Sequence, residues 1–293
     1  MRPHRKDQRM ITLKNDALIV SINPFGAELS GIKDTENATE YLWQGDPSVW
    51  SGQSPILFPI VGRLASDRFI YEGETYTLPK HGFARRSPFT VVATEPTYAA
   101  FSLKSGEETK RGYPFDFELL AEYRLDGKTI TVTNTVCNTG DKTMYFSLGA
   151  HPGFNIDIGD IVEFSGYERL APLLLDDAGL YIKEDTALIE HGNRLVITEN
   201  IFENDALFFR NLKSDCARII KKETGKAIVE MTFGGAEFLG LWAKPGAPYV
   251  CIEPWCGICD SVDVSGKIEE KPYVKTLGAG EKFVFTYEIR ILA

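Results

Sequence analysis

The segment Phe115-Asp-Phe-Glu-Leu-Leu-Ala-Glu-Tyr-Arg-Leu125 is followed by Asp126-Gly127 and then by Thr129-Ile-Thr-Val-Thr-Asn-Thr-Val136. The last of these runs alternates strictly, with its threonines on one face, and this pattern predicts a half-buried β-strand. Asp-Gly is a favoured pair for the type I′ turn that joins two antiparallel strands. We therefore predict an antiparallel hairpin over residues 115–136.

Other runs have the same character. The run Lys282–Leu292 places aromatic and branched apolar residues on one face and polar or charged residues on the other, which is typical of a strand with one solvated face. The run Phe69–Leu78 predicts a second hairpin, centred on Glu72-Gly73. Helical patterns are limited to single turns at Ser105–Arg111 and near Asp176.

Regularly spaced strands with turn signals predict an all-β fold, a large antiparallel β-sandwich or barrel. A chain of 293 residues suggests two domains by length alone, but sandwiches often run past about 200 residues as one unit. No internal repeat, linker or low-complexity segment divides the sequence. We predict one domain over residues 11–293, preceded by a disordered N-terminal extension, the basic and polar residues 1–10.

The overall charge limits the possible partners. The net charge of −9 argues against nucleic acid, because phosphate binding requires a basic field. Local basic pairs such as Arg85-Arg86 could still hold a small anion. No apolar run approaches the roughly 20 residues of a membrane-spanning helix, and the N-terminus lacks the apolar stretch of a secretory signal. We expect no membrane partner, and the oligomeric state is left open.

The five cysteines are Cys137, Cys216, Cys251, Cys256 and Cys259. An odd number in a long chain fits reduced thiols better than a disulfide framework, which predicts a cytoplasmic location. Cys256 and Cys259 form a C-x-x-C with Cys251 nearby, but a zinc site needs a fourth ligand and the sequence has no second C-x-x-C. We therefore expect no metal, and these three thiols have no assigned role.

Glu253 lies in Pro248-Tyr-Val-Cys-Ile-Glu-Pro-Trp-Cys-Gly257, at the end of a short apolar run. Pro254 has no N–H to donate and pushes the residue before it toward extended geometry, so a strand is expected to stop at Glu253. The carboxylate could act as a base with a raised pKa or accept hydrogen bonds in a sugar pocket. The alternative is a glutamate paired with a lysine at a sheet edge.

Two histidines have similar surroundings. His81 lies in Lys-His-Gly-Phe-Ala-Arg85, and His151 lies in Leu-Gly-Ala-His-Pro-Gly-Phe154. Each adjoins a strand-like run, a glycine or proline and an aromatic residue, and backbones with such breakers can approach a ligand closely. A histidine that satisfies loop carbonyls is the alternative for each. Together with Glu253, the two histidines favour a functional site.

Arg63 and Asp205 complete the candidate set. Arg63 ends the mostly apolar segment Pro55–Arg63, where a guanidinium must be paired or must face a ligand. A buried salt bridge is its alternative role. Asp205 precedes another apolar run, and turn capping is its alternative. The chain has no glycine-rich phosphate loop and no Gly-x-Ser-x-Gly, so nucleotide binding and a hydrolase nucleophile are unsupported.

Four motifs together resemble the aldose 1-epimerase (mutarotase) family, in its LacX-like branch. They are Phe58-Pro-Ile-Val-Gly-Arg63, His81-Gly-Phe-Ala-Arg85, His151-Pro-Gly-Phe154 and Glu253-Pro-Trp255, and they occur in the order found in that family. The resemblance runs from about residue 11 to the C-terminus. It implies a large β-sandwich of the galactose-mutarotase type and an enzyme that interconverts α and β anomers of free sugars without a cofactor.

The resemblance also implies roles for individual residues. Glu253 matches the general base of the family, His151 the general acid and His81 the second histidine of the active site. Arg63 matches an arginine that contacts the sugar, and Asp205 matches an acid that holds sugar hydroxyls. Mutarotation needs such groups, because the C1 hydroxyl must lose a proton while the ring oxygen gains one.

Two features leave the substrate open. Trp255 could stack on the apolar face of a pyranose, as could Phe83 and Phe154, but each is equally suited to the core. Related hexose-6-phosphate epimerases hold the phosphate with arginines, so Arg85 could bind such a group, although the net charge of −9 argues weakly against it. A non-catalytic carbohydrate-binding protein on the same fold is the third possibility.

Overall fold

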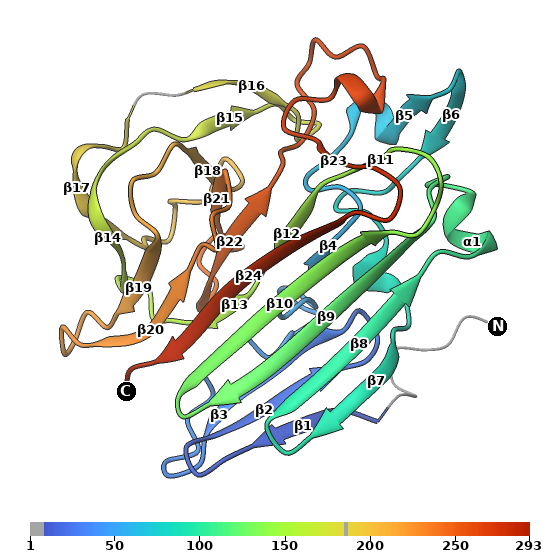
Figure 1. Cartoon of the computed structure of the whole chain (residues 1–293). Coiled ribbons are helices and arrows are strands. Elements are labelled where there is room, and N and C mark those ends of the chain that lie inside the picture. Colours follow the sequence, from blue (N-terminus) through green and yellow to red (C-terminus); the bar gives the residue numbers. More distant parts are fainter. Residues whose placement is uncertain (1–8, 185–186) are drawn as a thin grey trace.

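The computed structural model describes residues 9–184 and 187–293. Strands dominate this part of the chain, and its one α-helix is the four-residue α1 (Glu107–Lys110) (Figure 1). The strand pairs within its sheets are antiparallel, so the predicted all-β antiparallel sandwich is confirmed. The predicted N-terminal extension lies outside the described residues, apart from Arg9 and Met10. No helix among the described residues is long and apolar enough to cross a membrane.

The larger sheet has nine strands. In spatial order they are β17 (Ile189–Val196), β14 (Ile161–Leu170), β19 (Cys216–Ile220), β20 (Ala227–Thr232), β24 (Lys282–Ile291), β10 (Thr129–Asn138), β9 (Phe117–Asp126), β8 (Tyr98–Lys104) and β7 (Thr90–Glu95). The predicted hairpin is the pair β9–β10, with alternating buried and less buried residues along both strands. Its turn falls one residue later than expected, because Asp126 already pairs with Thr129.

The second sheet has eight strands and carries the candidate site. Its order is β16 (Tyr181–Glu184), β15 (Leu173–Leu175), β18 (Leu207–Arg210), β21 (Phe238–Trp242), β22 (Tyr249–Cys256), β12 (Leu148–Ala150) and β4 (Ile56–Leu57), and β13 (Gly153–Asn155) also pairs with β22. Every residue of β22 is buried, because the strand lies inside the molecule with both faces covered.

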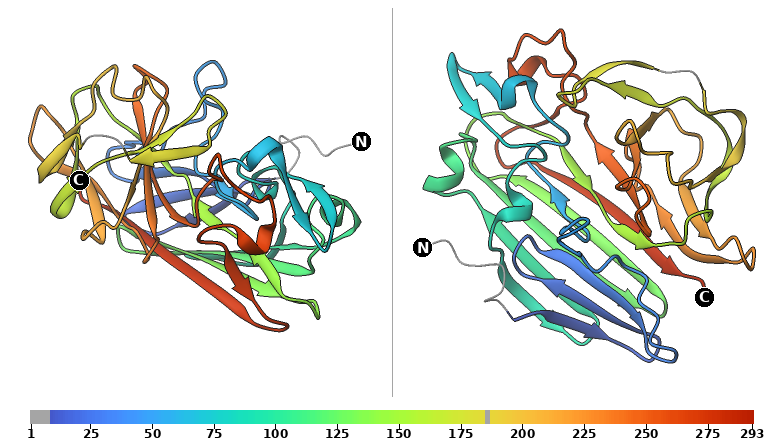
Figure 2. Two further views of the ribbon diagram at one scale, coloured as in Figure 1. Left: turned by 90° about the horizontal axis from the view of Figure 1, so that it is seen from above. Right: turned by 180° about the vertical axis from the view of Figure 1, so that it is seen from behind.

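Smaller sheets complete the fold. The three-stranded sheet consists of β1 (Ile11–Lys14), β2 (Leu18–Asn23) and β3 (Glu28–Asp34), and the ribbons are β5 (Arg68–Tyr71) with β6 (Glu74–Thr77) and β11 (Met144–Phe146) with β23 (Lys275–Leu277). The β5–β6 ribbon is the second predicted hairpin. In both views of Figure 2, the β1–β3 sheet and the eight-stranded sheet lie over the same face of the nine-stranded sheet. One apolar core fills the space between these layers.

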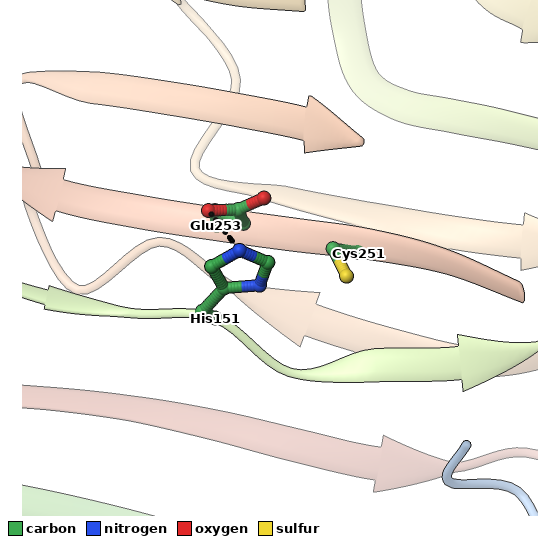
Figure 3. Close-up of side chains that lie close together, drawn as sticks. All are labelled: His151, Cys251 and Glu253. Carbon is green, nitrogen blue, oxygen red and sulfur yellow. Dashed lines mark ion pairs between the residues drawn. The ribbon is translucent and has the colours of Figure 1, made fainter. Parts of the chain in front are cut away.

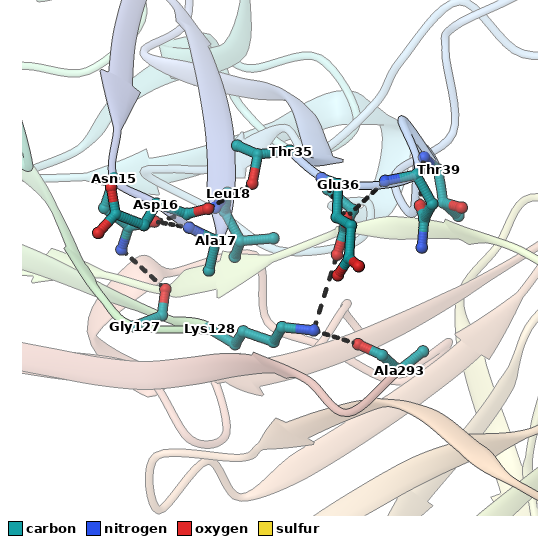
Figure 4. A network of polar contacts seen from close by, with 12 residues as sticks. Asn15, Asp16, Ala17, Leu18, Thr35, Glu36, Thr39, Gly127, Lys128 and Ala293 are labelled. Atoms are coloured by element: carbon teal, nitrogen blue, oxygen red, sulfur yellow. Dashed lines mark hydrogen bonds and ion pairs between the residues drawn. The ribbon is translucent and has the colours of Figure 1, made fainter.

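Polar contacts fasten the small sheet to the large one. The amide of Asn15 donates to the carbonyl of Gly127 in the β9–β10 turn (2.8 Å), and Lys128 in the same turn lies 3.7 Å from Asp34 of β3. Lys128 also donates to the backbone of Ala293, so the turn, the small sheet and the C-terminus meet at one place (Figure 4).

The expected end of the strand at Glu253 is wrong, since β22 continues to Cys256. Pro254 is tolerated because of what lies beside it. Ile252 donates its N–H to the carbonyl of Pro152 (3.2 Å), and Pro254, two residues further on, faces the same side of the strand. On that side the neighbouring strand is interrupted, because β12 ends at Ala150 and β13 begins at Gly153. The missing N–H of Pro254 therefore breaks no continuous ladder.

Candidate active site

The interruption between β12 and β13 brings an acid and a histidine together. Both strands pair with β22 in the same register, so His151, which lies in the gap, falls opposite Glu253. The Nε2 atom of His151 lies 3.3 Å from Oε2 of Glu253, and both side chains are buried (Figure 3).

Glycines on the strands beside β22 make room for large side chains. Gly240 of β21 is the register partner of Glu253, and a Cβ there would lie 2.8 Å from the ring of Phe208. Gly149 of β12 pairs with Trp255, and its Cβ would lie 2.8 Å from that indole. A real Cβ atom essentially never lies this close to another heavy atom, so a larger residue at either position would displace the aromatic ring or the strand.

A backbone group fixes the protonation of His81. The N–H of Gly62 donates to Nδ1 of His81 (3.0 Å), and the N–H of His81 donates to the carbonyl of Gly62 (2.7 Å). An Nδ1 atom that accepts a hydrogen bond carries no proton in the neutral ring, so the proton is on Nε2. His81 has a φ of 65°, in the left-handed region, and the paired hydrogen bonds hold it there.

These groups line one cavity of about 170 Å³. Six of the seven predicted site residues contribute to its wall, namely His81, Arg85, His151, Asp205, Glu253 and Trp255. These residues come from four separate parts of the chain, namely the segment of His81 and Arg85, the gap at His151, the turn at Asp205 and strand β22. Lys80, Trp50 and Trp242 also line the cavity, and sequence analysis missed all three.

Arg63 is the predicted site residue that the structure does not bring to the cavity wall. Its Nε lies 3.5 Å from Asp67, and both side chains are about two-fifths exposed. This surface pair differs from both roles considered for Arg63, a sugar contact and a buried salt bridge. Its neighbour Gly62 does line the cavity. The motif Phe58–Arg63 therefore contributes to the site through the backbone of Gly62 and not through the side chain of Arg63.

Two cations and an acid face the same space. Nζ of Lys80 lies 4.0 Å from a carboxylate oxygen of Asp205, and Nη2 of Arg85 donates to the carbonyl of Lys80 (2.8 Å). The Nε of Arg85 is buried, and none of the described residues offers it a hydrogen-bond partner. Burial lowers the pKa of Arg85 to about 10, which still leaves it charged at neutral pH.

Tryptophans form the apolar walls. The ring of Trp50 stacks on His151 with centroids 5.0 Å apart, and Trp242 meets the same imidazole edge-on at 5.7 Å. Trp255 meets His81 edge-on at 5.6 Å and is almost fully buried, so it serves both as cavity wall and as core. Phe83 and Phe154 do not line this cavity; both pack in the main core.

Burial disfavours charge on the acid and on both histidines. It raises the pKa of Glu253 well above its ordinary value, an effect that the positive charge of Lys80 opposes. Burial, with Arg85 and Lys80 nearby, lowers the pKa of His151 to about 3, and burial holds the pKa of His81 well below its ordinary value. Burial thus favours the neutral forms of Glu253 and His151 over an ion pair between them.

Comparison with known proteins identifies the relatives of this chain. The sequence model of the aldose 1-epimerase family matches residues 9–290. The chromosomal LacX protein of Lactococcus lactis subsp. lactis is 34% identical over 96% of this chain and 99% of its own length. A protein of Escherichia coli K12, provisionally named a glucose-6-phosphate 1-epimerase, is 36% identical, but the match covers 39% of this chain and 35% of that protein.

Solved structures agree with the sequence matches. A galactose mutarotase related enzyme from Lactobacillus acidophilus superposes with a TM-score of 0.91 at 30% identity, covering 97% of this chain and 98% of the other. The expected sandwich of the galactose-mutarotase type is thereby confirmed. With a match along nearly its whole length in sequence and in structure, the chain belongs to the aldose 1-epimerase family.

Proposed function

We propose that this protein is a mutarotase, which interconverts the α and β anomers of an aldose such as glucose or galactose by acid–base catalysis. The observation that carries the proposal is the buried contact between Glu253 and His151 in the wall of a cavity. A structural role alone does not account for a carboxyl and an imidazole buried together, because burying ionisable groups destabilises a fold.

In this reaction Glu253 removes the proton of the C1 hydroxyl while His151 protonates the ring oxygen. The bond between C1 and the ring oxygen breaks, C1 becomes an aldehyde carbon, and rotation about C1–C2 presents its other face. Ring closure then returns both protons along the reverse path. In the reactive form of the pair Glu253 is ionised and His151 is protonated, and each group contributes a factor of about 10²–10⁴.

The remaining cavity residues bind and position the sugar. His81 donates a hydrogen bond from Nε2 in its neutral form. Lys80 favours the ionised form of Glu253. Asp205 and Arg85 hold sugar hydroxyls, and Trp255 offers an apolar surface. This mechanism uses no cofactor. The unpaired cysteines support a reducing compartment such as the cytoplasm as the place of action.

The test is anomer exchange, followed by polarimetry or NMR on fresh α-D-glucose and α-D-galactose. We expect Glu253→Gln and His151→Asn each to lower kcat/KM by about 10²-fold or more, since each removes one proton-transfer group. His191→Asn is the matched control, because His191 stacks on Tyr167 in another part of the protein. Full activity in both site variants would refute the roles, and sugar binding without exchange in the wild type would indicate a binding protein.

A second candidate is a hexose-6-phosphate 1-epimerase. It is favoured by two cations, Lys80 and Arg85, in the wall of the cavity that holds the acid–base pair. The deciding measurement compares kcat/KM for glucose with that for glucose 6-phosphate. Arg85→Met should abolish a preference for the phosphate, while Arg86→Met, which removes the exposed neighbouring arginine, should leave it intact. No preference in the wild type would exclude this candidate.

A further inference from the structure

Cys251 has no part in the mechanism, yet it lies beside the acid–base pair. It precedes Glu253 by two residues on β22, so both side chains project from the same face of the strand. One ligand atom each from His151, Cys251 and Glu253 lies within 4.8 Å of the other two, and all three residues are buried. In Figure 3 the sulfur of Cys251 lies on the side of the imidazole that carries Nδ1.

The polar atoms of this cluster lack good partners. No described residue offers a hydrogen-bond partner to Nδ1 of His151. Oε2 of Glu253 has the 3.3 Å contact with Nε2 of His151, whose geometry falls short of a hydrogen bond. Buried polar atoms are almost always paired in folded proteins, and exceptions call for an explanation. The cluster thus has two buried atoms able to take up a ligand.

We propose that His151, Cys251 and Glu253 form a site for Zn²⁺ or a similar borderline-soft divalent cation, and that the bound ion inhibits the enzyme. Imidazole, thiolate and carboxylate are the three ligand types that zinc takes in proteins. The thiolate and the carboxylate together carry two negative charges, so the bound ion is neutralised within the cluster. Such balance is needed at a site this deeply buried.

The geometry requires only small movements. Ligand atoms around a tetrahedral zinc ion are about 3.5 Å apart, so the present spacing, within 4.8 Å, must contract by about 1 Å. His151 and Glu253 line the cavity, which provides the entry path and leaves room for a water as fourth ligand. Coordination displaces the thiol proton of Cys251 and the carboxyl proton of Glu253, while neutral His151 binds through the nitrogen that carries no proton, and both displaced protons pass to the buffer.

Inhibition follows because the ion occupies the catalytic acid and base at once. This part of the inference rests on the proposed mutarotase function, whereas metal binding itself does not. The two parts are therefore tested by separate measurements on the full-length protein.

Binding is tested with Co²⁺, which gives an intense near-ultraviolet charge-transfer band when a thiolate coordinates it. We expect the band in the wild type and in Cys256→Ala, and its loss in Cys251→Ala. Cys256 is the matched control because it is a buried thiol on the same strand, outside the cluster. Absence of the band in the wild type, or its persistence in Cys251→Ala, would overturn the proposal. If Cys251→Ala does not fold, Cys251→Ser, which keeps the side-chain size, replaces it.

Inhibition is tested by titrating the mutarotation rate with Zn²⁺, each variant being compared with its own rate in chelator. Loss of an outer-shell partner alone can cost about tenfold in metal affinity, so loss of Cys251 should weaken inhibition by at least that much. Cys256→Ala should be inhibited like the wild type. Equal inhibition of Cys251→Ala would refute the inhibitory site. A cobalt band in a protein without mutarotase activity would uphold the binding site and refute the proposed function instead.

Discussion

The proton on His81 is placed by the backbone of Gly62, not by another side chain. Because the amide of Gly62 occupies Nδ1, the imidazole can only donate from Nε2. Burial and the nearby cations keep the ring neutral. His81 is therefore suited to hydrogen bonding in a fixed direction, while proton transfer belongs to Glu253 and His151.

This assignment distinguishes two substitutions at His81. Glutamine places an amide nitrogen near the position of Nε2 and keeps a donor toward the cavity, whereas asparagine places its oxygen near Nδ1 and removes that donor. We expect His81→Gln to keep kcat/KM within about tenfold of the wild type and His81→Asn to lose about 10²-fold or more, as for other positioned donors. Anomer-exchange kinetics measure both. A more active His81→Asn would show that the contact with Gly62 matters more than the donor.

Lys80 sets the charge balance around Glu253. Its ammonium lowers the pKa of Glu253, so its removal must raise that pKa further. A base is active when ionised, and a higher pKa therefore moves the acid limb of the pH profile of kcat/KM upward. Since Lys80 is two-fifths exposed, solvent screens it, and we expect Lys80→Met to shift the limb by less than about one pH unit. Lys104→Met, a change at a well-exposed lysine of β8, should shift nothing. A downward shift in Lys80→Met would contradict the assignment.

At the scale of the elements, the site depends on β21, β22 and the gap between β12 and β13. Gly240 lets Phe208 pass across β21 beside Glu253. We expect Gly240→Ala to lower both the free energy of unfolding, by about 1–3 kcal/mol, and kcat/KM, because the new methyl group displaces either Phe208 or the strand. Urea unfolding and anomer-exchange kinetics measure the two effects.

The matched control for that change is Gly106→Ala. Gly106 has an extended backbone, and nothing lies within 4 Å of the position of its Cβ. If both glycine variants lost the same stability, the effect at Gly240 would come from the glycine itself and not from the crowding by Phe208.

Sequence patterns predicted the strands whose two faces differ. In β24 the apolar face is largely buried and the polar face largely exposed, so hydrophobicity alternates along the strand. The pattern fails at β22, because both faces are buried and nothing alternates. There Pro254 suggested that the strand ends at Glu253. The strand continues, because the neighbouring strand is interrupted and the missing N–H of Pro254 breaks no continuous ladder.

Local sequence patterns predicted the site only in part, for a similar reason. His81, His151 and Glu253 were found because breakers and aromatic residues mark them in the sequence. That His151 faces Glu253 follows from the register of two strands about a hundred residues apart, which no local pattern encodes. Trp242 joins the cavity through the pairing of β21 with β22 and Trp50 comes from a loop, so neither has a local signal, and Lys80 had none beyond its position next to His81.

At the scale of the whole molecule, the eight-stranded sheet both packs in the main core and forms part of the cavity wall. One apolar core joins it to the nine-stranded sheet, and a smaller cluster contributes Trp255 and Phe208 to the wall of the cavity. The large core can stabilise the fold enough to tolerate the ionisable groups buried in the cavity wall, where they lower stability.

The cost of one of these groups can be measured through the pH dependence of unfolding. Because the pKa of Glu253 in the folded protein is above 4.5, its value when unfolded, the neutral carboxyl contributes stability that is fully present below pH 4.5. This contribution is lost as the pH rises toward the pKa of the folded state. Glutamine is neutral at every pH and has no such loss. Glu253→Gln should therefore unfold at a higher temperature than the wild type at pH 7–8, and the difference should shrink toward pH 4.

The stability contributed by His151 depends on pH in the opposite sense, but His151 is present in both the wild type and Glu253→Gln. Its pKa falls from 6.5 to about 3 on folding, so its contribution is lost as the pH falls below 6.5 in the wild type and in Glu253→Gln alike. The difference in Tm between the two proteins, measured by calorimetry across this range, therefore reports on Glu253 and on its contact with His151. A difference that stayed constant with pH would mean that Glu253 is ionised in the folded protein, which would contradict a carboxyl held neutral by burial. A catalytic carboxyl held neutral by burial requires the gain in stability to grow with pH.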